Sequence, residues 1–180
     1  MKVDLIAAAL KDVSLLHDVC TTAYTQHFTN QWESAAALEQ YLAGSFSAER
    51  LTKDILDPGT TYYLIYADDQ PAGFVKLNDQ LKASDQALRF PNALELERIY
   101  MLAEVKGTGV GKIAMEKIEG IAREKQKSAI VLYVVDVNET AIRFYERNGF
   151  MKTGKTRLEL PGFREEVKPT TIMSKTLPDL

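Results

Sequence analysis

The chain has 180 residues, of which 46% are hydrophobic and 26% charged, and its formal net charge at pH 7 is −3. These values exclude a disordered chain and argue against a nucleic-acid binder with a broad basic face. With Cys20 as the one cysteine and only two histidines, no disulfide framework and no metal site are expected, and the cytoplasm is the expected location. We expect a single domain over residues 1–180, with neither a signal peptide nor a membrane span.

The first part of the chain predicts one strand and three helices. Residues 3–8 are expected to form a short strand, and Asp12 can cap a helix that ends near Phe28, because apolar residues recur at helical spacing between them. Two further amphipathic helices are expected over residues 33–43 and 47–56.

The middle of the chain changes to strand-forming sequence. Residues 61–66 and 72–77 are rich in aromatic and β-branched side chains and are separated by a turn at residues 68–70, so they predict a hairpin. The polar residues 78–92 are expected to form a loop. Alternation of apolar and polar side chains over residues 94–102 predicts the next strand.

Helices and strands alternate in the last part of the chain. Helices are expected over residues 110–125 and 138–148, with a strand over residues 129–135 between them. Two closing strands are expected over residues 150–160 and 167–176. Strands interleaved with helices around a mixed sheet predict an α/β or α+β fold.

A glycine-rich loop lies between the expected strand 94–102 and the helix that follows it. Glycines let the backbone approach a ligand closely, and the free N–H groups at the start of a helix bind phosphate oxygens, so we expect an anion site here. The loop residues are Lys106, Gly107, Thr108, Gly109, Val110, Gly111 and Lys112.

Two known nucleotide-binding motifs differ from this loop. A P-loop is excluded, because Lys106 stands where its first glycine is required and Ile113 where it needs Ser or Thr. The dinucleotide fingerprint would need a third glycine at Lys112, and only Asp136 at the end of the next strand keeps it as an alternative. A tight turn without any ligand is the other alternative.

A second motif covers the expected helix over residues 138–148. Asn138 can cap its start, Gly149 can end it in a left-handed conformation, and Phe144 and Tyr145 fall on one face. Taken alone, Tyr145 would be a core aromatic residue with its hydroxyl at the rim of the core.

Together the two motifs resemble the GCN5-related N-acetyltransferase (GNAT) family. They take the form Lys106-x-x-Gly-x-Gly and, some thirty residues later, Asn138-x-x-Ala-x-x-Phe-Tyr-x-x-x-Gly-Phe. More closely, residues 96–100, 62–76 and 172–177 are similar to the bacterial spermine/spermidine acetyltransferases of the PaiA type. The resemblance implies the GNAT fold, a central mixed, mostly antiparallel, splayed sheet flanked by helices.

The resemblance also implies a place for acetyl-CoA. The sheet would open between the strand ending at Met101 and the strand 129–135, with main-chain groups of Ile99, Tyr100 and Met101 beside the cofactor. The glycine-rich loop would hold the pyrophosphate, and Asn138 would touch the cofactor. Lys106 replaces the commoner Arg or Gln, so it supplies a cation without the bidentate fork of an arginine.

Amine acetylation needs a base for the acceptor nitrogen and a proton for the departing thiolate. Glu97 is the predicted general base, acting through water, because partial burial can raise the pKa of a carboxylate. Tyr145, implied to sit beside the thioester sulfur, is the predicted general acid. Phe28, Trp32 and Glu95 are expected on the acceptor side. The alternative is that Glu95 and Glu97 lie on the surface or only bind a cationic substrate.

These features predict direct transfer of an acetyl group to a primary amine, with a polyamine such as spermidine or spermine as the leading acceptor. An N-terminal peptide or an aminoglycoside is an alternative acceptor, and a non-catalytic acyl-CoA-binding regulator is an alternative function. The expected partner is a small-molecule amine, with no nucleic acid and no membrane. A homodimer is compatible with the sequence.

Overall fold

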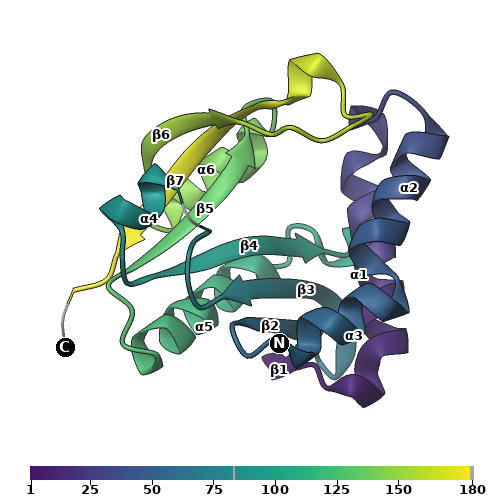
Figure 1. Ribbon diagram of the computed structural model, residues 1–180. Coiled ribbons are helices and arrows are strands. Elements are labelled where there is room, and N and C mark those ends of the chain that lie inside the picture. The colour runs from purple at the N-terminus through teal and green to yellow at the C-terminus, as the bar shows by residue number, and fades with distance from the viewer. Residues whose placement is uncertain (83, 179–180) are drawn as a thin grey trace.

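The computed structural model describes residues 1–82 and 84–178 and contains one sheet of seven strands in the order β1-β2-β3-β4-β5-β7-β6 (Figure 1). All neighbouring strands are antiparallel except β4 and β5, which are parallel. The expected mixed, mostly antiparallel α/β fold is therefore confirmed. The strands are β1 (Val3–Ala7), β2 (Thr60–Ala67), β3 (Gln70–Asn78), β4 (Ala93–Met101), β5 (Ala129–Val135), β6 (Met151–Arg157) and β7 (Pro169–Thr176).

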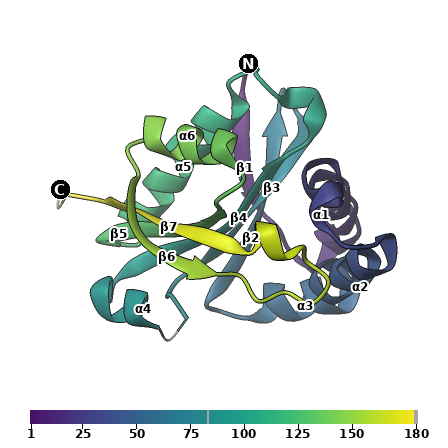
Figure 2. The same ribbon diagram turned by 90° about the horizontal axis from the view of Figure 1, so that it is seen from above.

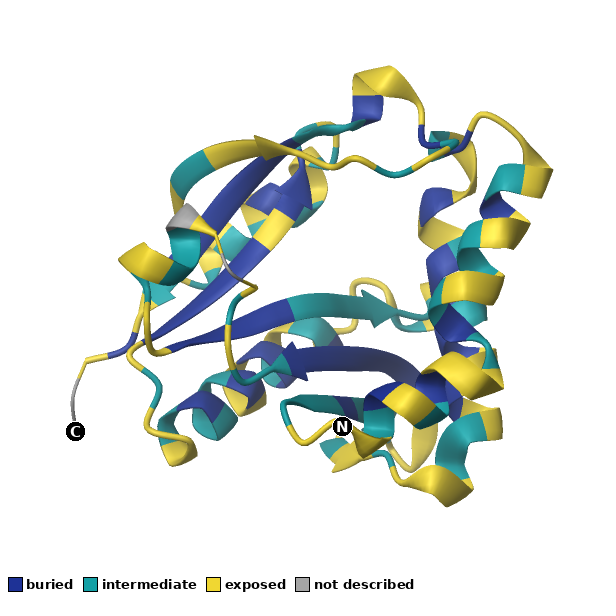
Figure 3. Cartoon of the chain, in the orientation of Figure 1, coloured by how far each residue is buried: buried dark blue, intermediate teal, exposed yellow. Residues whose placement is uncertain are grey.

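Helices cover both faces of the sheet (Figure 2). On one face lie α1 (Val13–Phe28), α2 (Ala35–Phe46) and α3 (Ala48–Leu56); on the other lie α5 (Val110–Glu124) and α6 (Glu139–Arg147). Each face has its own apolar core, and the buried residues gather on the central strands and on the inward sides of the helices (Figure 3). None of the helices in the described residues is both long enough and apolar enough to span a bilayer.

Element boundaries differ from expectation at four places. The expected loop 78–92 contains a short helix, α4 (Asp85–Arg89), which the hydroxyl of Ser84 caps. The expected helix 33–43 begins after the cap Ser34 and runs on to Phe46, whose side chain is fully buried. Strand β6 ends at Arg157, and β7 begins only at Pro169.

Strands β4 and β5 separate part of the way along their length. They pair only from Ala93 to Glu95 on β4, with Glu95 opposite Val131. Beyond Glu95, β4 continues to Met101 beside β3, and its edge toward β5 pairs with no other strand among the residues that the structure describes. The splay expected between these two strands is present.

A β-bulge in β4 falls at Glu97. Leu77 pairs with Leu96 and Lys76 pairs with Arg98, which leaves Glu97 as the extra residue on β4. Leu96 packs into the core under α5, whereas both Glu97 and Arg98 contact groups on the side of α1, α2 and α3. The bulge thus turns two consecutive charged side chains to the same face of the sheet.

The loop between β6 and β7 reaches across to the start of α2 (Figure 1). The N–H of Glu33 donates to the carbonyl of Gly162 at 2.9 Å, and the N–H of Arg164 donates to the carbonyl of Gln31 at 3.0 Å. Gly162 has a φ of +77°, and a Cβ atom there would lie 2.5 Å from Cβ of Ala37, so only glycine fits without rearrangement. We call residues 31–33 and 162–164 together the loop bridge.

Candidate active site

The glycine-rich loop forms the N-terminal end of α5, where the sequence places an anion site. Gly107 and Gly109 have φ values of +79° and +90°, and Gly109 caps the helix. Both face open space. Lys106 and Lys112 are exposed on either side. Within the part of the chain that the structure describes, these backbone N–H groups donate to no backbone acceptor: Gly107, Gly109, Val110 and Gly111.

These features fit a phosphate group. Unpaired N–H groups at a helix start carry about half a positive charge between them and bind anions. Thr108 adds local order, since its hydroxyl donates to the carbonyl of Val105 at 2.7 Å. The two lysines supply further positive charge without being tied into buried ion pairs.

The free edge of β4 lies next to this loop in the chain. Ile99, Tyr100 and Met101 pair with β3 on one side and leave their other side open toward the splay. The end of the strand is held by α1, because Nε2 of His27 lies 2.8 Å from the carbonyl oxygen of Met101. Because the carbonyl oxygen can only accept, Nε2 is the donor of this hydrogen bond. Sequence patterns gave no sign of this contact, which joins residues 74 positions apart.

Asn138 and Tyr145 both belong to α6, as expected. The side-chain oxygen of Asn138 accepts from the N–H of Ala141 at 3.1 Å and caps the helix, which leaves its NH₂ group for another partner. A Cβ atom at Gly111 would lie 3.5 Å from the ring of Phe144, so α6 lies close to the first turn of α5. The two motifs are thereby brought together in space.

Tyr145 packs against the core and also keeps a free hydroxyl. Its ring lies 5.4 Å from that of Phe144 and 5.8 Å from that of Phe150. Burial raises its pKa well above the ordinary value, so the phenol stays protonated. No hydrogen bond of the hydroxyl is found in the described residues. A protonated, unpaired phenol suits a proton donor.

Two carboxylates stand side by side at the point where β4 and β5 separate. Glu95 is 6% exposed and Glu97 is half-buried. The side-chain NH₂ of Asn78 donates to both, at 2.7 Å each, and its oxygen accepts from the hydroxyl of Thr60 at 2.9 Å. We call Glu95 and Glu97 the carboxylate pair.

The two members of the carboxylate pair have opposite pKa shifts. For Glu95, burial raises the pKa, and the nearby Glu97 raises it further, against the lowering effect of Asn78. For Glu97, burial alone would raise the pKa, but Arg98, Lys76 and Asn78 outweigh it and the pKa is lowered. The expected upward shift at Glu97 is therefore wrong, and the upward shift belongs to Glu95.

Cations explain this difference. Nζ of Lys76 lies 3.1 Å from Oε2 of Glu97, and the guanidinium of Arg98 lies 3.6 Å from Oε1. Glu95 makes no ion pair with any residue that the structure describes. Lys76 itself is 4% exposed and forms a second ion pair with Asp54 of α3, at 3.1 Å.

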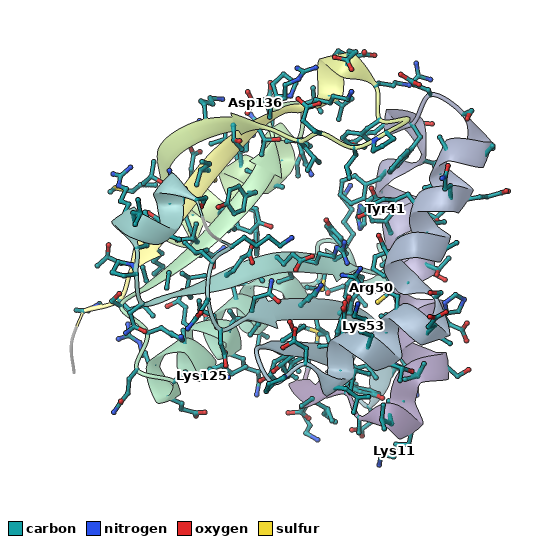
Figure 4. The ribbon with its side chains drawn as sticks, in the orientation of Figure 1. Lys11, Tyr41, Arg50, Lys53, Lys125 and Asp136 are labelled. Atoms are coloured by element: carbon teal, nitrogen blue, oxygen red, sulfur yellow. The ribbon has the colours of Figure 1, made fainter. Side chains whose placement is uncertain are left out.

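Sequence patterns missed this buried network. The one signal was a lysine inside an otherwise apolar strand, since Lys76 follows Phe74 and Val75 on β3. The guanidinium of Arg98 also donates to the hydroxyl of Tyr41 at 3.2 Å, and Tyr41 extends from α2 toward β4 (Figure 4).

Phe28 and Trp32 lie in the wall beside this network. Phe28 packs on Tyr100 with ring centroids 5.0 Å apart, and Trp32 lies 4.8 Å from Tyr41 and 5.1 Å from Phe163. Both are buried, so they shape the wall mainly by packing. The rings join α1, α2, the end of β4 and the loop bridge.

Comparison with known proteins agrees with this geometry. The sequence profile of the Acetyltransferase (GNAT) family matches residues 22–150. An uncharacterized N-acetyltransferase of Lactobacillus delbrueckii subsp. lactis is 31% identical over 115 residues, which cover 64% of this chain and 65% of that relative. The matched part is thus a little under two thirds of that relative's length.

Two relatives of lower identity are named for different acceptors. The peptidyl-lysine N-acetyltransferase YjaB of Escherichia coli is 24% identical over 128 residues, covering 70% of this chain and 74% of that protein. The spermidine N(1)-acetyltransferase of Thermoplasma acidophilum is 23% identical over 154 residues, covering 83% of this chain and 89% of that protein.

Solved structures share the fold over the whole length. The PaiA N-acetyltransferase of Thermoplasma acidophilum, solved in complex with coenzyme A, matches with a TM-score of 0.77 and 22% identity. The match covers 98% of this chain and 100% of that one. The family match, the splayed sheet and the glycine-rich loop agree, and this chain belongs to the GNAT family of acetyl-CoA-dependent N-acetyltransferases.

Proposed function

We propose that this enzyme transfers the acetyl group of acetyl-CoA directly to a primary amine of a polyamine such as spermidine or spermine. The observation that carries the proposal is the buried carboxylate pair, Glu95 and Glu97, at the point where β4 and β5 separate. A polyamine is cationic, and it meets two carboxyl groups there, of which Glu95 has no cation of its own. The spermidine N(1)-acetyltransferase relative supports the same acceptor class.

The carboxylate pair divides two tasks between its members. A pair whose environments push the two pKa values apart has distinct acid–base roles. Glu97 stays ionised and presents a fixed negative charge to the acceptor's ammonium group. Glu95, with the raised pKa, accepts the proton that the attacking nitrogen must lose, directly or through water. The sequence favoured Glu97 as the general base; we now propose Glu95 for that role and keep Glu97 as the binding charge.

On the donor side, the main chain carries most of the binding. The glycine-rich loop from Lys106 to Lys112 holds phosphate oxygens, the free edge of β4 from Ile99 to Met101 offers peptide groups, and Asn138 offers its NH₂. When bound, acetyl-CoA supplies the acetyl group, whose bond to sulfur breaks as the amide bond to the acceptor nitrogen forms. Tyr145 gives its phenolic proton to the departing thiolate.

The loop bridge favours a small acceptor over a folded protein surface. Its two backbone hydrogen bonds tie the β6–β7 loop to the start of α2, beside the aromatic wall. A lysine on a protein would bring its backbone and neighbouring side chains against this loop. A thin, flexible polyamine brings only methylene and amine groups. The peptidyl-lysine acceptor of the YjaB relative is the second candidate, on the strength of that similarity.

Initial rates of thiol release from acetyl-CoA test the proposal. The panel contains spermidine, spermine, a short diamine, an aminoglycoside and a lysine-containing peptide. We expect the highest kcat/KM with spermidine or spermine. A preference for the peptide or the aminoglycoside would contradict a polyamine as the acceptor class. Acetyl-CoA binding without turnover on any amine would favour a non-catalytic regulator. The cytoplasmic location, the single domain over residues 1–180 and the homodimer stay predictions of the sequence.

A further inference from the structure

A chain of buried charges runs behind the carboxylate pair from α3 to β4. Nζ of Lys76 lies 3.1 Å from Oδ2 of Asp54 and reaches both oxygens of Glu97, at 3.1 Å and 3.3 Å. The hydroxyl of Tyr62 donates to the same oxygen of Asp54 at 3.3 Å. On the outer side, the guanidinium of Arg50 pairs with the other oxygen of Asp54 at 2.9 Å.

Lys76 is placed where a lysine is costly unless its charge is matched. Its side chain is 5% exposed and lies over the ring of Tyr62, with Nζ 5.5 Å from the ring centroid. Burial of a charge without a partner is strongly unfavourable, so Lys76 needs both of its carboxylate partners. A network of this kind fixes the position and the charge of every member.

Arg98 is a second cation that lowers the pKa of Glu97, but it lies near one carboxylate oxygen, whereas Lys76 reaches both. Arg98 is farther from Glu97, at 3.6 Å, and its guanidinium is shared with the hydroxyls of Tyr41 and Tyr62. Titratable and charged groups surround the network from six elements. They are Cys20 of α1, Tyr41 of α2, Arg50 and Asp54 of α3, Tyr62 of β2, Glu95, Arg98 and Tyr100 of β4, and Tyr133 of β5, and the charge of Lys82 also acts on Glu95.

We propose that Lys76, held from behind by Asp54, is a positioning residue that fixes Glu97 as an anion and so makes Glu95 the member of the pair that takes the acceptor's proton. Asn78 completes the arrangement, because one NH₂ group donates to both carboxylates and keeps them adjacent. The negative charge fixed on Glu97 then disfavours a second one on Glu95. This inference rests on the proposed function, since it assigns a task to Glu95 in the acetyl transfer.

Two variants that should shift the pH profile of kcat/KM in opposite directions test the inference. Lys76→Met removes the cation, so both carboxylates hold their protons to higher pH. The acid limb of the kcat/KM profile moves to higher pH. At a pH on the lower part of this limb, kcat/KM of the variant, taken relative to its own plateau, falls about tenfold. Asp54→Asn removes the other carboxylate partner of Lys76, so the positive charge of Lys76 is balanced by Glu97 alone. The carboxylate pair then loses its protons more easily, and the acid limb moves to lower pH.

A matched control separates positioning from general damage. Lys53 lies one residue before Asp54 on α3 and is exposed (Figure 4), so Lys53→Met removes the same charge from the same helix outside the network. It should leave the acid limb in place. If Lys76→Met and Asp54→Asn move the limb in the same direction, or neither moves it, the positioning role is overturned.

A titration that needs no activity keeps the inference testable if Lys76→Met does not fold. Carbon NMR of the side-chain carboxyl groups in the wild-type enzyme, assigned with Glu95→Gln and Glu97→Gln, should show Glu97 losing its proton at lower pH than Glu95. The reverse order overturns the inference. If the order is as expected but Glu95→Gln keeps full activity, the proposed proton acceptor is wrong, while the order in which the two carboxyl groups lose their protons stands.

Discussion

The proposed donor side and the proposed acceptor side of this enzyme consist of different kinds of groups. The donor side uses backbone groups of short contiguous segments, the loop 106–112 and the free edge of β4. The acceptor side uses side chains from α1, α2, α3, β3 and β4, joined by buried ion pairs and stacked rings. A backbone site can be recognised by its glycines, whereas a side-chain site exists only once the chain has folded. The reaction is therefore easier to infer than the acceptor.

The largest expected effect tests the division within the carboxylate pair. Glu95→Gln keeps the hydrogen bond to Asn78 but removes the proton acceptor, so kcat/KM with spermidine should fall by about 10²- to 10⁴-fold, the usual loss for a general base. Steady-state kinetics measure this. Glu97→Gln serves as the matched variant and should cost less. A larger loss for Glu97→Gln would reverse the two roles.

Tyr145→Phe should affect chemistry and spare donor binding. The ring keeps its packing on Phe144 and Phe150, but the thiolate loses its proton donor, so kcat should fall by about 10²-fold, the low end of general acid catalysis. Acetyl-CoA affinity, measured by calorimetry, should stay the same. Unchanged kcat with a fast acceptor would mean that water protonates the thiolate.

Opening the loop bridge should weaken acceptor selection. In Gly162→Ala the new methyl group meets Ala37 at 2.5 Å in a left-handed backbone conformation, so the β6–β7 loop must move away from α2. We expect the preference for spermidine over a lysine-containing peptide to fall by roughly tenfold, the size of a lost small contact in a pocket. Gly44→Ala in α2 is the control, because nothing lies within 4 Å of its Cβ position. An unchanged preference would show that the loop bridge has no role in selecting the acceptor.

Lys106→Ala tests the donor side, where we expect a smaller effect. Lys106 is exposed, so its contact with a phosphate is screened by salt, and acetyl-CoA affinity should fall by only about 3- to 10-fold at low ionic strength. The loss should shrink as salt is added. Lys106→Arg should bind at least as tightly as the wild type, since arginine offers a bidentate contact. If Lys106→Ala and the wild type bind acetyl-CoA with equal affinity at low salt, Lys106 makes no contribution and the backbone N–H groups of the loop hold the phosphate without it.

The smallest expected effect is one of stability. Because the pKa of Glu95 is raised in the folded state, ionised Glu95 opposes folding. Protonated Glu95 carries no such penalty. The free energy of unfolding is therefore highest, as far as Glu95 is concerned, below the pKa that this group has in the unfolded chain, and it falls as the pH rises through the pKa of Glu95 in the folded state. Glu95→Gln should therefore raise Tm at neutral and alkaline pH, with a gain that disappears in acid. A constant difference in Tm across pH would contradict the raised pKa.

Much of the fold follows from the sequence. The alternation over residues 94–102 and the glycine-rich loop correctly locate β4 and the start of α5, because those patterns are local. The short helix α4 could not be predicted from the sequence, because five residues are too few to show a helical periodicity. The late start of β7 depends on pairing with β6, which local sequence does not record.

The candidate site follows the same division. The proposed donor-side residues come from two motifs whose local geometry the sequence predicts, because each motif is a strand-to-helix or helix-capping geometry in itself. The assignment of Glu97 as the residue with the raised pKa failed because a bulge places it against Lys76 and Arg98. Lys76 comes from a different strand, and Arg98, although it follows Glu97 in the sequence, reaches the same face of the sheet only because of the bulge.

The central claim is that the carboxylate pair serves the amine of a polyamine in an acetyl-CoA-dependent transfer. The most direct test compares kcat/KM for spermidine with that for a lysine-containing peptide, in the wild type and in Glu95→Gln, by thiol release from acetyl-CoA. The account predicts preference for spermidine in the wild type and a loss of about 10²-fold or more in the variant. Preference for the peptide, or full activity of Glu95→Gln on spermidine, would contradict it.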